Sequence, residues 1–280
     1  MSVQRLLETI ETINIAHRGA RSLAPENTLA AAAVALQAGS HMWELDVGMT
    51  RDGVPLVIHD STLERTSDAR TVFPLRRPWA VHDFTLEDIR RLDFGSWFVR
   101  QDPFGEIAGG GVSPAEAQGY IGLPAPTLAE ALDFTRRHNW CVNIEIKDLS
   151  GNPGHGVVVK KVLSLVDFLD MSGSVLISSF NHDYLAQARC LNPRIQLGVL
   201  TQRRLRDPLK LLRGLGALCY HPKITALAPG EAIRLKEEGF HTLVWVANDE
   251  AAFLQMRREQ VAGIFTDFPR RLTRFLAESS

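Results

Sequence analysis

The sequence predicts an α/β fold, a (β/α)8 TIM barrel, built as a single domain over residues 1–280. Strand-like and helix-like segments alternate to the end of the chain, and most of the eight strand-like segments are short apolar runs bounded by polar residues or glycine. Such runs are typical of parallel strands that are covered on both faces. Eight strand–helix units in about 250 residues are usual for this barrel. A doubly wound open sheet is the alternative, because it would also place a site at strand ends.

The predicted elements follow one another in regular order along the chain. The expected barrel strands are residues 13–17, 43–47, 141–147, 175–179, 195–200, 217–221, 242–246 and 263–266. Helices are expected at residues 29–38, 184–190, 231–238 and 250–260, and after Thr85 and Thr127. Residues 4–11 are expected to form a short helix or an ordered lead-in. Gly39 stands where a helix often ends, and Thr127 with Glu130 fits the capping box that begins one.

One further strand, residues 54–59, does not fit the alternation. Asp52-Gly53 precedes it, and a tight Asp-Gly turn is typical of an antiparallel hairpin. A parallel crossover would need about a dozen residues or more. We therefore predict a β-hairpin excursion after the second strand, which would return His59 toward Glu44 and Asp46.

The segment of about residues 95–126 is rich in glycine and proline, with a glycine run at 109–111. Loops of this length in compact domains are usually functional or disordered. We expect an inserted loop lobe before the third barrel strand, covering one side of the barrel mouth.

Composition excludes several classes of protein. The net charge is −1, without the basic surplus of a nucleic-acid-binding protein. Apolar runs are too short for a membrane-spanning helix, so no stable membrane insertion is expected, and residues 1–14 lack the order of a signal peptide. Three scattered cysteines suggest neither disulfides nor a zinc site. They indicate buried thiols in a reducing compartment, and we expect a cytoplasmic protein.

Three carboxylates stand near the ends of neighbouring predicted strands. Glu44 and Asp46 are two residues apart and therefore face the same side, and Glu145 interrupts the next apolar run. Like charges side by side are costly unless a positive charge lies between them, and hard divalent cations prefer carboxylate oxygens. The spacing thus favours a metal site, although these acids could instead be exposed, or could pair with buried arginines or, for Glu145, with Lys147.

Two histidines and an arginine lie beside the acids. His17 and His59 each end a strand next to charge, which suits general acid and base roles across one reacting phosphorus. Taken alone, each could equally be a buried core histidine whose ring nitrogens have hydrogen-bond partners. Arg18 precedes Gly19, where the backbone can approach a ligand closely, and its guanidinium matches phosphate oxygens. The combination indicates phosphate-ester chemistry.

Nine short motifs stand in the order seen in the glycerophosphodiester phosphodiesterase family, which the sequence resembles from residue 15 to residue 269. The motifs are His17-Arg18-Gly19, Pro25-Glu26-Asn27-Thr28, Glu44-x-Asp46-Val47, Thr50-x-Asp52-Gly53, His59-Asp60, Glu145-Ile146-Lys147, Ser179-Phe180, Trp245-x-x-Asn248 and Thr266-Asp267-x-Pro269. The ordered set is specific, although each motif alone is weak.

The resemblance implies a metal-dependent TIM-barrel enzyme that hydrolyses glycerophosphodiesters to an alcohol and sn-glycerol 3-phosphate. It implies one divalent cation, Mg²⁺ or Ca²⁺ with Mn²⁺ as a further option, held by Glu44, Asp46 and Glu145. It also implies His17 and His59 as the acid/base pair. The substrate contacts that it implies are Arg18, Lys147, Phe180 and Trp245.

Two alternatives remain open at this point. A lysophospholipase D or related phospholipase acting on intact lipids would need an apolar rim, which Trp97, Phe98 and Phe104 could supply unless they pack the insert onto the barrel. A non-catalytic binding protein on the same fold would be expected to have lost some of the five acids and histidines. The expected partner is a small glycerophosphodiester, not a nucleic acid.

Overall fold

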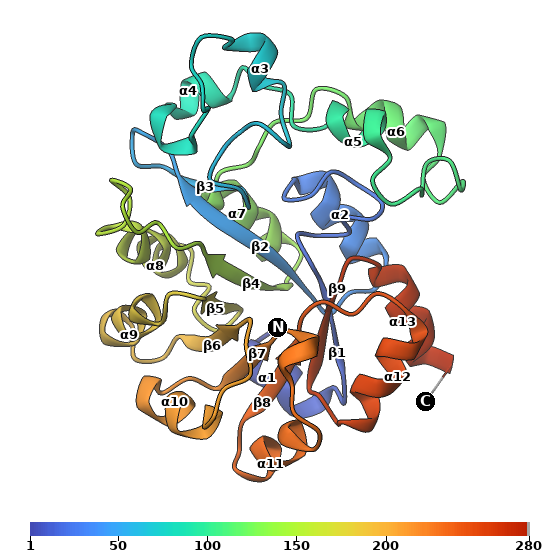
Figure 1. Ribbon diagram of the computed structural model, residues 1–280, viewed down its shortest axis with the longest axis vertical. Helices are drawn as coiled ribbons and strands as arrows, with labels where there is room; N and C mark the ends of the chain where they lie inside the picture. Colours follow the sequence, from blue (N-terminus) through green and yellow to red (C-terminus); the bar gives the residue numbers. More distant parts are fainter. Residues whose placement is uncertain (279–280) are drawn as a thin grey trace.

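The computed structural model describes residues 1–278 and confirms the predicted (β/α)8 barrel (Figure 1). Strand β1 pairs in parallel with both β2 and β9, which closes the sheet on itself. The eight barrel strands are β1 (Ile13–Ala16), β2 (Met42–Met49), β4 (Cys141–Ile146), β5 (Val175–Ser179), β6 (Gln196–Thr201), β7 (Cys219–Pro222), β8 (His241–Val244) and β9 (Gly263–Thr266). Each lies within two residues of its predicted bounds at either end.

Helices surround the barrel, and several of them begin at capping residues. They are α2 (Leu29–Gln37), α7 (Leu128–Arg137), α8 (Val158–Phe168), α9 (His182–Leu191), α10 (Pro208–Leu215), α11 (Glu231–Glu237), α12 (Glu250–Arg258) and α13 (Pro269–Glu278), with a short 3-10 helix η2 (Ile224–Ala226). The Thr127–Glu130 capping box is present at α7, and Gly39 follows α2 with φ +77°. Helices α8, α10 and α13 were not predicted, although Asp207 followed by Pro208 is an N-terminal signal for α10.

The hairpin prediction is also confirmed. Strand β3 (Pro55–Val57) runs antiparallel to β2, with Val47 opposite Val57 and Met49 opposite Pro55. Gly53 turns the chain with φ +73°, a conformation that glycine adopts without steric cost. The Ile58 N–H then donates to the Asp46 carbonyl oxygen at 2.9 Å, which sets the chain just before His59 against the strand that carries the acids.

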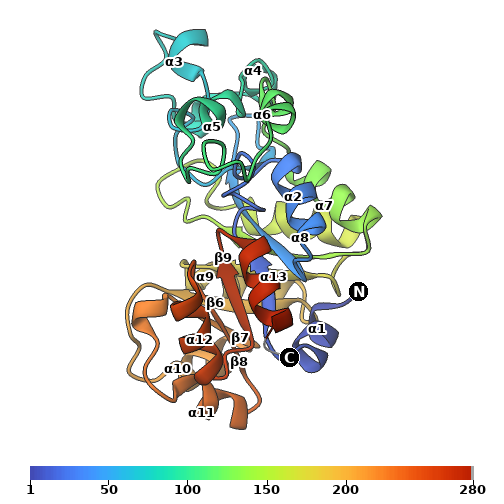
Figure 2. The same cartoon turned by 90° about the vertical axis from the view of Figure 1, so that its right-hand side faces the viewer.

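The inserted lobe gathers on one side of the barrel, at the top of both views (Figure 2). It contains α3 (Ala69–Val72), η1 (Val81–Asp83), α4 (Leu86–Ile89), α5 (Ser96–Gln101) and α6 (Pro114–Tyr120). Residues 95–126, expected to be irregular, thus hold two helices, and a Ser113–Glu116 capping box begins the second. The lobe also extends back over residues 60–94, where Phe73, Trp79 and Phe84 belong to a small core of its own.

Helix α1 (Val3–Thr9) packs on the N-terminal end of the barrel. Val3, Leu6 and Leu7 contact the apolar lower layer of the interior, to which Met42 and Leu176 belong. The polar side chains of these strands that line a cavity, such as Glu44 and Glu145, lie toward the opposite end, the mouth. This layering is usual in such barrels.

The cysteines depart from expectation at one position. Cys141 and Cys219 are buried free thiols, as expected, whereas Cys190 on α9 is exposed.

No helix within residues 1–278 is both long enough and apolar enough to cross a bilayer.

Candidate active site

A cavity of about 340 Å³ opens at the C-terminal ends of the barrel strands and is called the barrel cavity here. Eight of the nine predicted site residues line it: His17, Arg18, Glu44, His59, Glu145, Lys147, Phe180 and Trp245. The ninth, Asp46, does not line the cavity and is only 1% exposed. Asn143, Ser178 and Gln202 also line the cavity and were not predicted.

The three predicted metal ligands form one cluster. Glu44, Asp46 and Glu145 each offer an oxygen, and these oxygens lie within 4.8 Å of one another. The strand register explains the cluster, because Asp46 of β2 stands opposite Glu145 of β4, and Glu44 is two residues before Asp46 on the same face.

The charges of these carboxylates are incompletely compensated. Burial, together with the negative charges of Asp46 and Glu145, raises the pKa of Glu44 well above its ordinary value. Burial and Asp46 also raise the pKa of Glu145. Glu44 Oε2 accepts a hydrogen bond from the Arg18 N–H at 2.8 Å, but buried Glu44 Oε1 has no partner among the described residues. A hard divalent cation fits this set of oxygens.

Lys147 supplies part of the positive charge. Its Nζ lies 2.5 Å from Glu145 Oε1 and 3.2 Å from Asp46 Oδ1. Burial opposes its charge, yet Asp46 and Glu145 outweigh burial and raise the lysine pKa. Burial likewise opposes ionisation of Asp46, but Lys147 and Arg18 hold the Asp46 pKa well below its usual range. The ion pair between Glu145 and Lys147, one of the alternatives drawn from the sequence, is therefore present within the acidic cluster.

His17 is held by a carboxylate from the last strand. Its Nδ1 lies 2.7 Å from Asp267 Oδ1, and Asn248 Nδ2 donates to Asp267 Oδ2 at 2.8 Å. Because a carboxylate only accepts, the neutral ring carries its proton on Nδ1 and leaves Nε2 as the free acceptor. Burial and the charge of Arg18 lower the His17 pKa, although Asp267 opposes this shift.

His59 has the same arrangement with a different partner. Its Nδ1 lies 2.6 Å from Asp60 Oδ1, and Arg65 Nε donates to Asp60 Oδ2 at 2.6 Å. Both histidines therefore present Nε2 as the ring nitrogen not bound to an acid. Asp60 and Asp267 stand within the sequence motifs, but no role was predicted for either residue.

Side chains of the loop between β1 and α2 hold Arg18 and Asp46 in place by hydrogen bonds and ion pairs. Arg18 Nη1 donates to Glu26 Oε1 at 2.9 Å, and Arg18 Nε lies 3.2 Å from Asp46 Oδ2. Asn27 Nδ2 donates to Asp46 Oδ2 at 2.9 Å. Thr28 caps α2 by accepting from the Ala31 N–H at 3.1 Å. Consecutive residues of one motif thus hold the arginine, hold the acid and begin the helix.

Two aromatic rings, those of Phe180 and Trp245, line the barrel cavity. Phe180 and Trp245 meet edge to face with centroids 5.5 Å apart, and Trp245 Nε1 donates to the His221 carbonyl oxygen at 2.9 Å. Asn143 Nδ2 donates to Ser178 Oγ at 2.9 Å, which leaves the buried Asn143 Oδ1 with no partner among the described residues. This half of the cavity offers apolar surface and a free acceptor.

A second cavity, of about 280 Å³, adjoins the first and is called the lobe cavity here. The two share His59, Glu145, Lys147, Phe180 and Gln202. Val81 and His82 of the lobe line the second cavity, which also reaches Asp148 and Asn152 after β4. The mouth is therefore a two-armed cleft with His59 at the junction.

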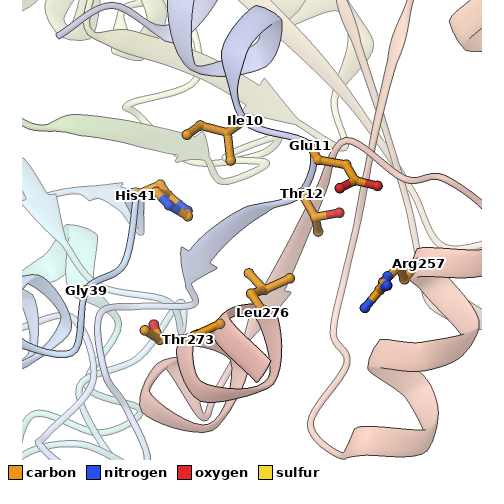
Figure 3. A pocket seen from close by; sticks show the side chains of 9 residues that line it. Ile10, Glu11, Thr12, Gly39, His41, Arg257, Thr273 and Leu276 are labelled. Atoms are coloured by element: carbon orange, nitrogen blue, oxygen red, sulfur yellow. The ribbon is translucent and has the colours of Figure 1, made fainter. Parts of the chain in front are cut away.

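Another pocket, of about 300 Å³, lies away from the mouth, between the chain before β1 and helices α12 and α13 (Figure 3). His41 points into it, but His41 Nδ1 already accepts the Asn14 N–H at 3.0 Å. Glu11 and Arg257 are its remaining charged side chains. It contains none of the acidic cluster, so the reactive groups of the molecule gather at the mouth.

A (β/α)8 barrel with three carboxylates, two carboxylate-bound histidines and an arginine at its mouth defines a hydrolase suited to phosphate esters. Residues 17–271 match the sequence profile of the glycerophosphoryl diester phosphodiesterase family, and the chain belongs to that family. It is accordingly a phosphodiesterase, which removes the alternative of a non-catalytic binding protein.

Individual relatives match over nearly their whole length. The chain is 32% identical over 263 residues to a glycerophosphodiester phosphodiesterase of Caldanaerobacter subterraneus subsp. tengcongensis, covering 94% of this chain and 97% of the relative. It is also 32% identical over 267 residues to one from Bacillus altitudinis, with the same two coverages.

Solved structures agree with the fold. An Oleispira antarctica phosphodiesterase in complex with the product sn-glycerol-3-phosphate superposes with a TM-score of 0.77 at 26% identity, covering 94% of this chain and 96% of that one. A glycerophosphodiester phosphodiesterase of Agrobacterium tumefaciens superposes with a TM-score of 0.71 at 27% identity, covering 94% and 99%.

Proposed function

We propose that this enzyme hydrolyses glycerophosphodiesters to an alcohol and sn-glycerol 3-phosphate, using His17 and His59 as the acid/base pair. The observation that carries the proposal is that both histidines line one cavity with the acidic cluster, each with Nδ1 bound to a carboxylate. The Oleispira antarctica neighbour, solved with sn-glycerol-3-phosphate, supports the choice of product.

Glu44, Asp46 and Glu145 are the residues proposed to hold one divalent cation, Mg²⁺ or Ca²⁺, with Mn²⁺ as a further option. The unpartnered Glu44 Oε1 and the raised Glu44 pKa support this assignment. A bound cation would offset negative charge on the phosphoryl oxygens as the ester bond breaks. Arg18 and Lys147, both lining the cavity, are proposed to contact the same phosphoryl group.

The cleft has two cavities, and a phosphodiester has two alcohol groups, one on each side of the phosphorus. We assign glycerol to the barrel cavity, where Asn143 Oδ1 can accept a hydroxyl hydrogen and Phe180 and Trp245 can pack on the carbon chain. The leaving alcohol then lies in the lobe cavity. The phosphorus falls between them, beside His59 and Lys147, which border both cavities.

This placement assigns the proton transfers. His17 borders only the barrel cavity, and its lowered pKa favours the neutral ring, so it is the proposed base for the nucleophile. That nucleophile is either water or the neighbouring glycerol hydroxyl, which would give a cyclic phosphate first. His59, which borders the lobe cavity, is the proposed acid that protonates the leaving alcohol.

The first test is release of glycerol 3-phosphate from glycerophosphocholine by the purified protein. The assay is run in EDTA and then with added Mg²⁺, Ca²⁺ or Mn²⁺. Release that depends on an added ion is expected. Release that is unaffected by EDTA would contradict the metal assignment, and no release with any ion would contradict the substrate class.

An intact-lipid substrate is the alternative, and the insert gives it little support. Trp97 and Phe98, which could have formed an apolar rim, are buried within the molecule. The Phe104 ring meets Phe268 edge to face at 5.5 Å, which packs the lobe onto the barrel. Choline release from lysophosphatidylcholine, measured beside glycerophosphocholine, separates the two substrate classes.

A reducing, cytoplasmic location also belongs to the proposal. The free thiols of Cys141 and Cys219, both buried, support it. Fractionation of cells that express the full chain would test it.

A further inference from the structure

We propose that Glu26 is a positioning residue that orients both histidines at once, acting through Arg21 and Arg65. This inference rests on the proposed function, because it assumes that His17 and His59 carry the proton transfers. Glu26 itself does not line either cavity of the cleft. It acts on the reaction only through the side chains that it holds.

Glu26 is saturated with arginine donors. Its Oε1 accepts from Arg18 Nη1 at 2.9 Å and from Arg65 Nη2 at 2.6 Å. Its Oε2 accepts from Arg21 Nη2 at 2.9 Å and from Arg65 Nη1 at 3.1 Å. The residue is only 5% exposed, and, although burial opposes ionisation, Arg65 and Arg18 lower its pKa to about 2. Glu26 is therefore a buried anion that fixes three guanidinium groups.

One branch of the network leads to His59. Arg65 grips Glu26 with two nitrogens and also donates from Nε to Asp60 Oδ2 at 2.6 Å. Asp60 in turn holds His59 Nδ1. The plane of one guanidinium thus fixes the distance between Glu26 and the acid that orients His59.

The other branch leads to His17. Arg21 donates to Glu26 from Nη2, and its Nη1 forms an ion pair with Asp267 Oδ1 at 3.5 Å. Asp267 holds His17 Nδ1. Glu26 therefore lies midway on a continuous path of charged groups from one histidine to the other.

The distribution of charge explains why loss of the Glu26 carboxylate would change the orientation of both the His17 and the His59 ring. Glu26 pairs with Arg18, Arg21 and Arg65. Arg21 and Arg65 also pair with Asp267 and Asp60, and Arg18 also pairs with Asp46. Without the Glu26 charge, Arg65 and Arg21 would turn more of their donors toward Asp60 and Asp267. Those two acids would then be drawn away from the histidines that they orient.

The loop between β1 and α2 does not need the Glu26 side chain to keep its conformation. The Ala20 N–H donates to the Ala31 carbonyl oxygen at 2.9 Å, and the Asn27 N–H donates to the Arg18 carbonyl oxygen at 3.0 Å. Thr28 caps α2 independently. These bonds hold the loop without the Glu26 side chain.

The test compares Glu26→Gln with Glu26→Asp, which keeps the charge, and with Glu238→Gln as the matched control. Glu238 also binds an arginine, Arg213 Nη2 at 2.7 Å, but it lies just after α11 and outside both cavities. Two readouts are measured on the full chain. The first is kcat and KM for glycerophosphocholine. The second is the ring-nitrogen NMR spectrum of histidine-labelled protein, with His17→Gln and His59→Gln used for assignment.

We expect Glu26→Gln to lower kcat at least about tenfold with KM changed by less than about threefold, and Glu26→Asp to recover part of the loss. The ring signals of both His17 and His59 should lose the fixed Nδ1–H form. Unchanged rings in Glu26→Gln, a change in only one ring, or equal changes in Glu238→Gln would overturn the proposal.

Two further variants keep the test decisive if Glu26→Gln does not fold. Arg65→Gln should alter the His59 ring alone, and Arg21→Gln the His17 ring alone. If neither ring moves, the network does not orient the histidines. The NMR readout does not depend on turnover, so a wild-type protein that releases no glycerol 3-phosphate would contradict the proposed function and leave the positioning of the rings still measurable.

Discussion

His17 Nδ1 and Asp267 Oδ1 lie 2.7 Å apart although the two residues are 250 positions apart in the sequence. Closure of the barrel causes this contact. Strand β1 pairs in parallel with β9, with Ala16 opposite Thr266, so the next residue of each strand reaches the mouth at the same level. The first and last strands together therefore complete one member of the proposed acid/base pair.

Replacement of Asp267 should change the pH dependence of the reaction. Burial and Arg18 lower the His17 pKa while Asp267 raises it, so Asp267→Asn should lower it further. In the wild type, the rising limb of kcat/KM should lie below about pH 6.5, the ordinary histidine value, and it should move to lower pH in the variant. The rate should also fall, because an amide can hold the wrong tautomer. An unchanged pH profile would remove Asp267 from this role.

The two histidines should respond differently to the leaving group. His17→Ala and His59→Ala should each fold and lose at least about a hundredfold in rate on glycerophosphocholine. A glycerophosphodiester with a nitrophenol as its alcohol needs little protonation on departure. His59→Ala should regain much of its rate on that ester, and His17→Ala should not. Recovery in the opposite variant would reverse the assignment of acid and base.

Replacement of a proposed ligand carboxylate should reduce the stabilisation of the folded protein by an added cation. A cation that binds only the folded protein stabilises it by RT ln(1 + [L]/Kd), so the melting temperature rises with the logarithm of the ion's excess over the dissociation constant. Added Ca²⁺ or Mg²⁺ should therefore stabilise the wild type in a thermal melt. The shift should be smaller in Glu44→Gln and Glu145→Gln, with Glu238→Gln as control. Wild-type shifts in both variants would contradict the proposed ligand set.

His221 should make folding sensitive to acid. The ring is 0% exposed, neither nitrogen has a partner among the described residues, and burial lowers the His221 pKa to about 3. The unfolded chain binds a proton near pH 6.5 and the folded chain does not, so stability falls as pH drops from 6.5 toward 3. Between pH 7 and pH 5 the loss should be about 2 kcal/mol.

His221→Leu isolates that contribution because leucine does not titrate. Urea unfolding at the two pH values should show a smaller loss of free energy in the variant than in the wild type. The variant should also be more stable at pH 5, since it buries no unpaired ring nitrogen. Equal losses in both proteins would mean that the ring is protonated, or pairs with water, in the folded state.

The sequence alone determined much of this protein because short-range signals carry the information. The barrel strands are apolar runs, and the polar or glycine residues that follow them mark their ends. The two residues Asp52-Gly53 are enough to predict the hairpin turn. The spacing of Glu44 and Asp46 already implies a shared face, since side chains alternate along a strand. The ordered motifs then indicated the family, which the profile match over residues 17–271 establishes.

Other features depended on contacts that no local pattern encodes. The helices of residues 95–126 escaped notice because glycine and proline dominate that stretch, although Ser113 and Glu116 form a readable capping box. The fully buried position of Asp46, outside the cavity that Glu44 and Glu145 line, follows from the packing of Asn27, Lys147 and Arg18 around it.

Only the tertiary structure decided how the proposed catalytic groups are held. Glu26, Arg65 and Asp267 come from the loop after β1, the lobe and the end of β9, and the order of these segments in the chain does not predict that they meet. Ion pairs of this kind form because a buried charge such as that of Glu26, which is 5% exposed, has little solvent and needs charged partners. Their partners are then set by three-dimensional proximity and not by separation along the sequence. Closure of β1 against β9 places Asp267, and the chain that follows β3 places Arg65.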